Sequence, residues 1–305
     1  MPFSLNLPYR ICYFCTRLVR RIRPQVHTAR AHDPRAYFQN QYESTATLRQ
    51  RFMSDVPIAD RSILDVGSGL GGRSPYWLEQ GANRVINIDI NRQELETGRT
   101  LLEKEFPNFV NHIEFHHPSE INETGFADTA ILFDCFEHLT DPEAVLKQVY
   151  AWLRPGGVLW IGSFGWYSYS ASHCTGHVPI LWCQLLFSER AIIHTIQTVI
   201  REPDYVLSFW ERTEGITRWD NVRTLKDRPG EPLNMLSLRR VRAILRKSPF
   251  DMTHFTVHGY SGHTHPGAKV LSFLAKVPVV KEVFHSYYTA VLTKPSHIQS
   301  SVHSR

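Results

Sequence analysis

The sequence predicts an α/β protein built on one doubly wound, mostly parallel, seven-stranded sheet whose last strand runs antiparallel. From residue 36 onward, short apolar segments alternate with helical patterns, which is typical of consecutive βαβ units. The apolar segment Ile63–Val66 runs directly into a glycine-rich turn, as the first strand of such a sheet does when it opens a nucleotide-type cofactor site. The alternation of strands and helices and the position of the glycine turn together indicate this fold class.

The first two thirds of the sheet follow from apolar periodicity and from helix-ending signals. A helix is expected over 36–53 because Phe38, Tyr42, Leu48 and Phe52 lie on or near one face. Pro107 ends a later helix, and Asp141 followed by Pro142 is a typical helix start. The expected helices are 36–53, 74–80, 91–105 and 141–153, and the expected strands are 61–66, 84–88, 113–115, 129–133 and 158–162.

The regular pattern breaks after the fifth strand. Residues 163–234 form an insertion before the next clear helix at 237–247. The remaining elements are a strand at 252–258, a helical stretch at 269–284 and a strand at 286–293. We therefore expect a basic N-terminal segment over 1–35, one domain over 36–295 with the insertion as a cap over the binding site, and a disordered tail at 296–305.

Charge is concentrated at the N-terminus of the chain. The net charge of the 305 residues is +5, and residues 1–35 hold seven Arg and one Asp. The rest of the chain is nearly neutral and shows no basic stripe, so we expect no nucleic-acid partner.

Cysteine content indicates a reducing compartment, and we expect the cytoplasm. Five cysteines in a chain of this length do not form a disulfide scaffold, and Cys12 and Cys15 are the only close pair. A second pair at metal-ligand spacing is missing, so no metal is expected. No apolar run approaches the roughly 20 residues that a membrane-spanning helix needs.

The N-terminal segment has the pattern of a basic amphipathic helix. Leu5, Leu7, Ile11, Phe14, Leu18 and Ile22 interleave with five arginines between positions 10 and 23. This pattern favours peripheral contact with a membrane through residues 1–30, so a cytoplasmic protein that associates with a membrane surface is also expected. A solvated helix packed on the domain and a targeting peptide are the alternatives.

The glycine turn allows two cofactors on spacing alone. Gly67-x-Gly69-x-x-Gly72 with Asp89 about 20 residues later satisfies the dinucleotide fingerprint, so NAD is permitted. A pyrophosphate in that turn would, however, lie close to the carboxylate of Asp65. A cofactor with an ammonium group and no phosphate, such as S-adenosylmethionine, reverses the sign of that interaction.

Four segments resemble the motifs of the class I S-adenosylmethionine-dependent methyltransferases. They are Asp65–Gly69, Asn87–Ile90, Phe133–Leu139 and Leu153–Leu159, and they occur in the family's order between residues 37 and 163. The resemblance implies a Rossmann-like fold, S-adenosyl-L-methionine as cofactor and methyl transfer as activity.

The resemblance also implies cofactor-binding residues. Asp65, Gly67, Ser68 and Gly69 would surround the methionyl part, and Phe133 would lie beneath the reacting methyl group. Asp89 would accept both ribose hydroxyls, and Ile90 would cover the adenine. The alternative for Asp89 is to cap the helix at 91–105. At the third strand this chain has His117-Pro118-Ser119-Glu120 where the family usually has an Asp, so Ser119 is assigned to the adenine amino group as a departure from the pattern.

The acceptor side, the part of the site that would bind the molecule to be methylated, is expected to consist of aromatic and histidine residues. His138 is the candidate general base because an imidazole titrates near neutral pH, and loop positioning is its alternative role. Trp166, Tyr167, His173 and His177 of the insertion are the candidate acceptor-binding residues, because ligands of such sheets bind at the carboxyl ends of the strands.

Three functions remain open from the sequence. The first is a methyltransferase acting on a small-molecule, amphiphilic or lipid-like acceptor. The second is an NAD-dependent oxidoreductase, although no Tyr is followed four residues later by Lys, as a short-chain dehydrogenase would require. The third is a methyltransferase-like binding protein without turnover.

Overall fold

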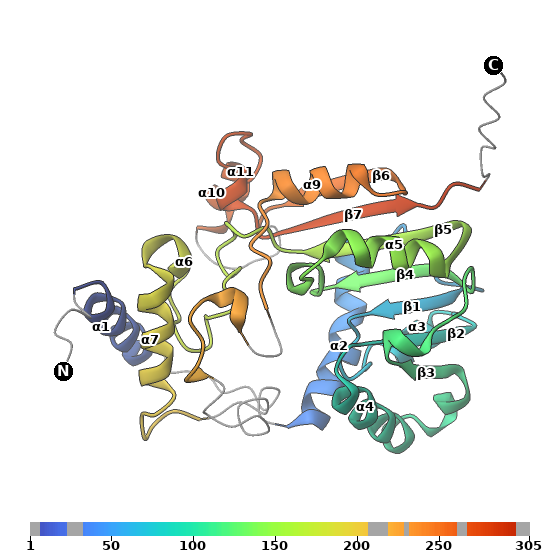
Figure 1. The fold of residues 1–305 in the computed structure, drawn as a ribbon, viewed down its shortest axis with the longest axis horizontal. Helices are drawn as coiled ribbons and strands as arrows, with labels where there is room; N and C mark the ends of the chain where they lie inside the picture. The colour runs from blue at the N-terminus through green and yellow to red at the C-terminus, as the bar shows by residue number, and fades with distance from the viewer. Residues whose placement is uncertain (1–6, 23–32, 207–218, 229–231, 261–266, 297–305) are drawn as a thin grey trace.

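A computed structural model describes residues 7–22, 33–206, 219–228, 232–260 and 267–296 of the chain. Within these residues one seven-stranded sheet has the order β3-β2-β1-β4-β5-β7-β6 (Figure 1). The strands are β1 Ser62–Val66, β2 Arg84–Ile88, β3 Ile113–His116, β4 Ala127–Phe133, β5 Leu153–Ser163, β6 Asp251–His258 and β7 Tyr287–Thr293. The first five strands pair in parallel, and β7 is antiparallel to both of its neighbours. The predicted fold class is confirmed.

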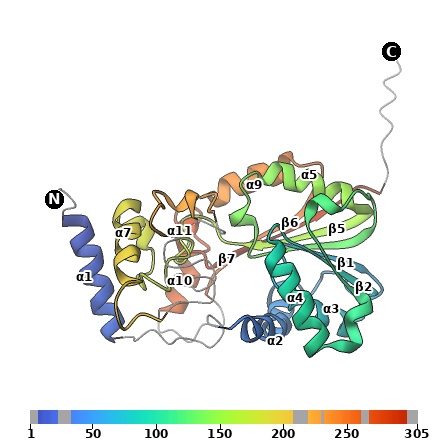
Figure 2. The same cartoon turned by 60° about the horizontal axis from the view of Figure 1, so that its bottom comes forward.

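Helices cover both faces of the sheet, as Figure 2 shows. On one face α2 (Pro34–Phe52), α3 (Ser74–Glu79) and α4 (Arg92–Glu105) bury Phe38, Trp77 and Leu102. On the other face α5 (Pro142–Trp152) and α9 (Leu238–Lys247) bury Leu146, Val149 and Val241. Strands that are apolar on both faces, such as β1 with all five residues buried, require cover of this kind.

Most predicted helix boundaries hold because the capping residues act as expected. Asp141 caps α5 by accepting the backbone N–H of Ala144 at 3.0 Å. The stretch expected as one helix at 269–284 is divided into α10 (Ala268–Leu274) and α11 (Lys281–Phe284). Pro278 lies between them, and a proline cannot continue a helix because its ring blocks the preceding turn.

The insertion has a hydrophobic core of its own. Its helices α6 (Cys183–Leu186) and α7 (Glu189–Val199) were not predicted from the sequence. Ile192, Ile196 and Trp219 are buried there together with Cys12 of α1 (Leu7–Ile22). The N-terminal segment therefore packs on the insertion, and α2 begins at Pro34, one residue before the predicted segment ends.

Figure 1 shows the insertion at the end of the sheet toward which the β1 and β4 arrows point. This is the carboxyl end of those strands, where ligands of doubly wound sheets bind. None of the helices in the described ranges combines the length and the apolarity needed to cross a bilayer. Of the predicted disordered tail at 296–305, residues 297–305 lie outside the described residues.

Candidate active site

The turn after β1 requires glycine for both conformational and steric reasons. Gly67, Gly69 and Gly71 have φ angles of +70°, +56° and +70°, in the left-handed region that favours glycine. A Cβ at Gly67 would lie 2.3 Å from the Sγ of Cys135, which follows β4. The turn therefore packs directly against the loop after β4, and this packing joins the two candidate motifs at one edge of the sheet.

Gln41 of α2 clamps the same turn, and the sequence did not predict this role. Its Oε1 accepts the backbone N–H of Gly72 at 3.1 Å, and its Nε2 donates to the carbonyl of Ser68 at 3.3 Å. The side chain of Ser68 is fully buried, and its Oγ has no hydrogen-bond partner within the part of the chain that the structure describes. A buried polar atom of this kind is expected beside a ligand that satisfies it.

Asp65 is not the bare carboxylate that the sequence suggested. It is fully buried and pairs with the guanidinium of Arg73, whose Nε lies 3.1 Å from Oδ2. Burial alone would lower the pKa of Arg73, but the charge of Asp65 raises it on balance above its ordinary value, so this guanidinium stays charged although it is buried. The electrostatic argument for an ammonium group over a pyrophosphate assumed an unpaired carboxylate at Asp65, and this premise does not hold because Arg73 pairs with it.

Arg73 also accounts for the surroundings of Phe133. Its guanidinium lies 5.4 Å from the centre of the Phe133 ring, and the same ring stacks on Trp160 with ring centres 6.0 Å apart. Phe133 is thus held at the end of β4 by a cation and an indole. Contact of Phe133 with a cofactor stays a prediction.

Asp89 has the geometry of a preformed acceptor at the end of β2. Its Oδ2 accepts the N–H of Gly69, and its Oδ1 accepts the N–H of Asn91, both at 2.9 Å. Burial raises the pKa of Asp89, and these backbone donors oppose the shift. Each carboxylate oxygen has a second lone pair for a ligand hydroxyl.

The competing explanation for Asp89 fails. Asn91 caps α4, and its side chain accepts the N–H groups of Gln93 and Glu94. Ile90 beside it is 75% exposed, which leaves an apolar side chain at the edge of the turn for a flat ligand to cover. The ribose and adenine assignments stay predictions that this geometry supports.

Ser119 takes part in a local turn. Its Oγ lies 2.7 Å from the Nδ1 of His117, and Glu120 pairs with Arg92. The side chain is exposed and has room to reorient. The adenine contact assigned to Ser119 remains untested.

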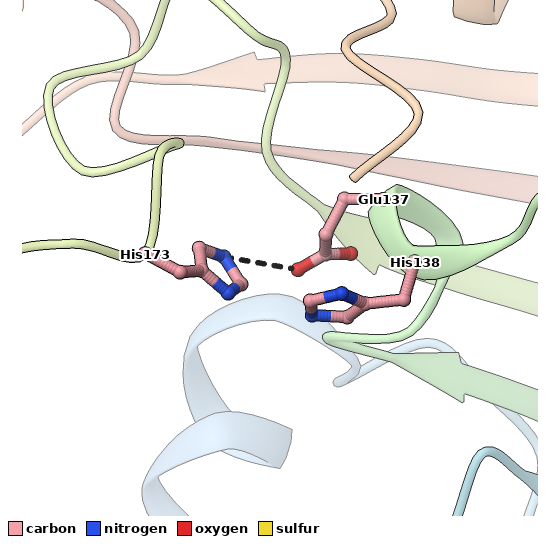
Figure 3. Close-up of side chains that lie close together, drawn as sticks. All are labelled: Glu137, His138 and His173. Atoms are coloured by element: carbon pink, nitrogen blue, oxygen red, sulfur yellow. Dashed lines mark ion pairs between the residues drawn. The ribbon is translucent and has the colours of Figure 1, made fainter. Parts of the chain in front are cut away.

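Three side chains meet beyond the end of β4, as Figure 3 shows. Glu137 and His138 come from the 3₁₀ turn after β4, and His173 comes from the insertion. The Nε2 of His173 lies 3.7 Å from the Oε1 of Glu137, which is an ion-pair distance when the ring is protonated. The other oxygen of Glu137 accepts the hydroxyl of Ser163 at 2.6 Å. A buried carboxylate is therefore held between two imidazoles.

The tautomer of His138 follows from its backbone contact. Its Nδ1 lies 3.0 Å from the carbonyl oxygen of Pro232, and a carbonyl can only accept, so Nδ1 carries the proton. Nε2 is then the nitrogen that can take up a proton from a substrate. This arrangement meets the requirement for a general base whose orientation is fixed.

The same cluster supplies three potential metal ligands. One donor atom from each of Glu137, His138 and His173 lies within 4.8 Å of the others. In a tetrahedral zinc site with metal–ligand distances near 2.1 Å, donor atoms lie roughly 3.4 Å apart. The cluster would therefore have to contract to hold such an ion, and the sequence-based expectation of no metal stays a prediction.

The other insertion residues are distributed over different environments. His177 is buried and packs against Tyr205 and Trp219 of the insertion. Tyr167 is 39% exposed. Trp166 borders a small recess beside Glu137 whose volume of about 10 Å³ holds at most a water molecule. Of the four predicted acceptor residues, the structure brings His173 and Trp166 to the cluster.

Asp134 is a further unpredicted member of the site. It adopts a φ of +48°, unusual for a residue with a side chain, and accepts the hydroxyl of Tyr287 at 3.0 Å. Asp134 is exposed to solvent, yet the surrounding protein desolvates its carboxylate enough to raise its pKa to about 6.

A separate hollow of about 450 Å³ lies between α9 and β6. Arg242 and Phe255 are among the residues that line it, and none of the candidate site residues does.

Comparisons with known proteins agree with this geometry. Residues 36–172 match a family described as a methyltransferase domain. The ubiquinone biosynthesis O-methyltransferase of Psychrobacter cryohalolentis is 29% identical over 109 residues, which cover 34% of this chain and 41% of that protein. Phosphoethanolamine N-methyltransferase 2 of Caenorhabditis elegans is 26% identical over 125 residues, which cover 41% of this chain and 28% of that protein.

The match thus spans less than half the length of these relatives. A crystal structure of an S-adenosylmethionine-dependent methyltransferase from Mesorhizobium loti superposes with a TM-score of 0.49 at 13% identity, over 82% of this chain and 97% of that one. Residues 36–172 thus form a methyltransferase domain, and the sheet has the class I S-adenosylmethionine-dependent methyltransferase fold.

Proposed function

We propose that this protein transfers a methyl group from S-adenosylmethionine to a small-molecule acceptor and that His138 removes the acceptor's proton. The observation that carries the proposal is the convergence of the glycine turn after β1 with the Glu137–His138–His173 cluster after β4. Gly67 packs on Cys135, only two residues before Glu137, so the cofactor side and the acid–base side adjoin. This proximity is what a transfer between two bound molecules requires.

The cofactor side fits the zwitterionic cofactor of the family. Asp89 offers two fixed oxygens to vicinal hydroxyls, Ile90 offers an apolar cover, and Ser68 offers a buried hydroxyl. The glycine turn has no side chains that would block close approach of a ligand. When bound, S-adenosylmethionine supplies an electrophilic methyl group on a sulfonium.

The acceptor side fits an acceptor that must lose a proton as it is methylated. The proton passes to Nε2 of His138, and the resulting imidazolium lies beside the buried carboxylate of Glu137. Because Glu137 is 6% exposed, water screens this attraction only weakly. His173 completes the cluster and pairs with the same carboxylate when it is protonated. A hydroxyl or amine is the acceptor group that such a base serves.

The proposed acceptor is small and amphiphilic or lipid-like. Phe164 and Trp166 place aromatic side chains beside Glu137, around a recess that by itself admits no more than a water molecule, and the insertion lies at this end of the sheet. Two of the relatives are named for ubiquinone biosynthesis and for phosphoethanolamine, which are an apolar and a polar context. Their difference leaves the choice of acceptor to experiment.

The test begins with the full chain and calorimetric titration of S-adenosylmethionine, its demethylated product and NAD. Binding of the first two without NAD is expected. Preferential binding of NAD would overturn the proposal in favour of an oxidoreductase.

The second step incubates the protein with methyl-labelled S-adenosylmethionine and fractionated cell extract. Label should appear in a small-molecule or lipid fraction with the native chain and be missing with Asp89→Ala. Cofactor binding without transfer to any fraction would instead identify a binding protein without turnover.

A further inference from the structure

The N-terminal helix α1 attaches to the rest of the protein by its polar side. Tyr13, Arg17 and Arg20 all contact the carboxylate of Glu202, at 2.7, 2.8 and 3.0 Å. Tyr9 lies 3.1 Å from the hydroxyl of Thr198 at the end of α7. Cys12 and Thr16, between these residues on the same side, are fully buried. This attachment fixes which side of α1 faces outward.

The outward side of α1 is an apolar stripe. It consists of five side chains that are exposed by 67%, 45%, 67%, 47% and 71%, namely Leu7, Ile11, Phe14, Leu18 and Ile22. At about 100° per residue they fall within an arc of about 80°, opposite the buried side. An amphipathic helix that served only to pack on its domain would bury this stripe. The helix does pack on the domain, as one alternative expected, but the exposed stripe is not the side that holds it there.

The stripe lies at the periphery of the molecule. Figures 1 and 2 both place α1 at one end, with α7 on its inner side and no labelled element beyond it. Large apolar side chains grouped in this way on an outer surface mark an interaction site.

Charge distinguishes the partners that such a stripe could meet. Arg10 and Arg21 are exposed and flank the stripe, and residues 1–35 as a whole hold seven Arg against one Asp. A second copy of this chain packed stripe to stripe would bring these arginines together and repel. The apolar stripe and the flanking arginines together fit a surface that carries negative charge above an apolar layer. An anionic phospholipid bilayer has that composition.

We propose that α1 lies in the interface of an anionic phospholipid bilayer, with the apolar stripe inserted among the acyl chains and Arg10 and Arg21 on the headgroups. The polar side stays bound to Glu202, so the insertion and the site are held next to the membrane. This attachment does not depend on the methyltransferase activity. It would bring the domain to membrane-borne acceptors if the acceptor is a lipid.

The experiment is flotation of the full chain with vesicles of phosphatidylcholine, with or without about 30% phosphatidylserine. Binding to the anionic vesicles is expected, weaker by about tenfold on neutral ones and decreasing with salt. The double variant Phe14→Asp/Leu18→Asp should lose at least about tenfold in affinity for the anionic vesicles. Circular dichroism and melting temperature check that this variant is folded.

The matched control is Val270→Asp/Phe273→Asp on α10. These side chains are exposed by 63% and 67%, so the control adds the same charge to an equally exposed apolar pair elsewhere. It should bind vesicles like the native chain. Equal loss in both variants, or no binding of the native chain to anionic vesicles, would overturn the proposal. A dimer in ultracentrifugation that Phe14→Asp/Leu18→Asp dissolves would overturn it in favour of self-association.

Discussion

The cofactor side and the acceptor side of the site are built in different ways. On the cofactor side, Gly67, Gly69 and Asp89 come from two neighbouring βα turns, which are joined directly by the hydrogen bond from the N–H of Gly69 to Asp89. On the acceptor side, Glu137 and His173 are brought together by an insertion with its own core. The first side depends on local backbone geometry, and the second on the packing of two separate hydrophobic units.

The two sides should therefore respond separately to substitution. A change at the turns should alter cofactor affinity, and a change in the cluster should alter turnover.

The largest effect is expected for His138→Gln. Glutamine retains an N–H donor for the carbonyl of Pro232 but cannot take up a proton, so the rate constant for transfer should fall about 10²- to 10⁴-fold. Cofactor affinity in calorimetry should stay within about twofold. The matched control is His254→Gln on the exposed edge strand β6, which should leave the rate unchanged. An unchanged rate in His138→Gln would assign this histidine a structural role.

Asp89→Ala should affect the opposite side. Loss of two charge-assisted hydrogen bonds should weaken S-adenosylmethionine binding by at least about 100-fold. Circular dichroism should be unchanged, because Asn91 still caps α4. Asp251→Ala, at an exposed strand end, is the control. Equal cofactor binding by Asp89→Ala would remove the ribose assignment.

Gly67→Ala tests whether the two sides are mechanically joined. The left-handed backbone costs an alanine about 1–2 kcal/mol in free energy of unfolding. Gly125→Ala has a similar φ of +63° and an open surrounding, so it isolates that backbone cost. Gly67→Ala should lose more stability than this control in urea unfolding, because its Cβ meets Cys135. Equal losses of stability in Gly67→Ala and Gly125→Ala would show that Cys135 and its loop can move aside to accommodate the added Cβ.

A smaller effect concerns Asp134 and pH. Its pKa of about 6 in the folded protein lies above the ordinary value of 3.8, so ionisation is disfavoured in the fold. The free energy of unfolding of the wild type should therefore fall, relative to that of Asp134→Asn, as pH rises from about 4 to 6. Above about pH 6 the difference in free energy of unfolding between the two proteins should stay constant. Melting temperatures of both proteins at pH 4.5 and 7 measure it. If the two melting temperatures differ equally at pH 4.5 and 7, the pKa of Asp134 is not raised by the fold.

The smallest effect is expected for metal removal. Dialysis against a chelator should leave transfer activity unchanged if Glu137, His138 and His173 act by proton transfer. Loss of activity that returns with one divalent ion would show that the cluster contracts around a metal, and it would move the acceptor side to a different chemistry.

The elements of the sheet were predictable because their signals are local. Strand β2 and helix α4 follow from apolar periodicity and a capping residue, and both lie within one residue of the prediction. Helix α7 does carry local signals that the prediction missed, since Ser188 caps it and Ile192, Ile196 and Val199 repeat on one face. Helix α6, with 4 residues, is too short to show a helical period. The role of Gln41 escaped prediction, since a polar residue in the middle of a helix gives no indication of which turn it will meet.

The succession of strands and helices along the chain, the glycine turn and the resemblance to the family can all be recognised in short segments, because they depend on backbone conformation and apolar periodicity. The pairing of charges and faces is a property of the folded protein. Arg73 neutralises Asp65, His173 and not His177 reaches Glu137, and α1 turns its apolar stripe outward. Such pairings depend on where side chains point once the elements have packed, and their energies depend on burial that exists only after folding.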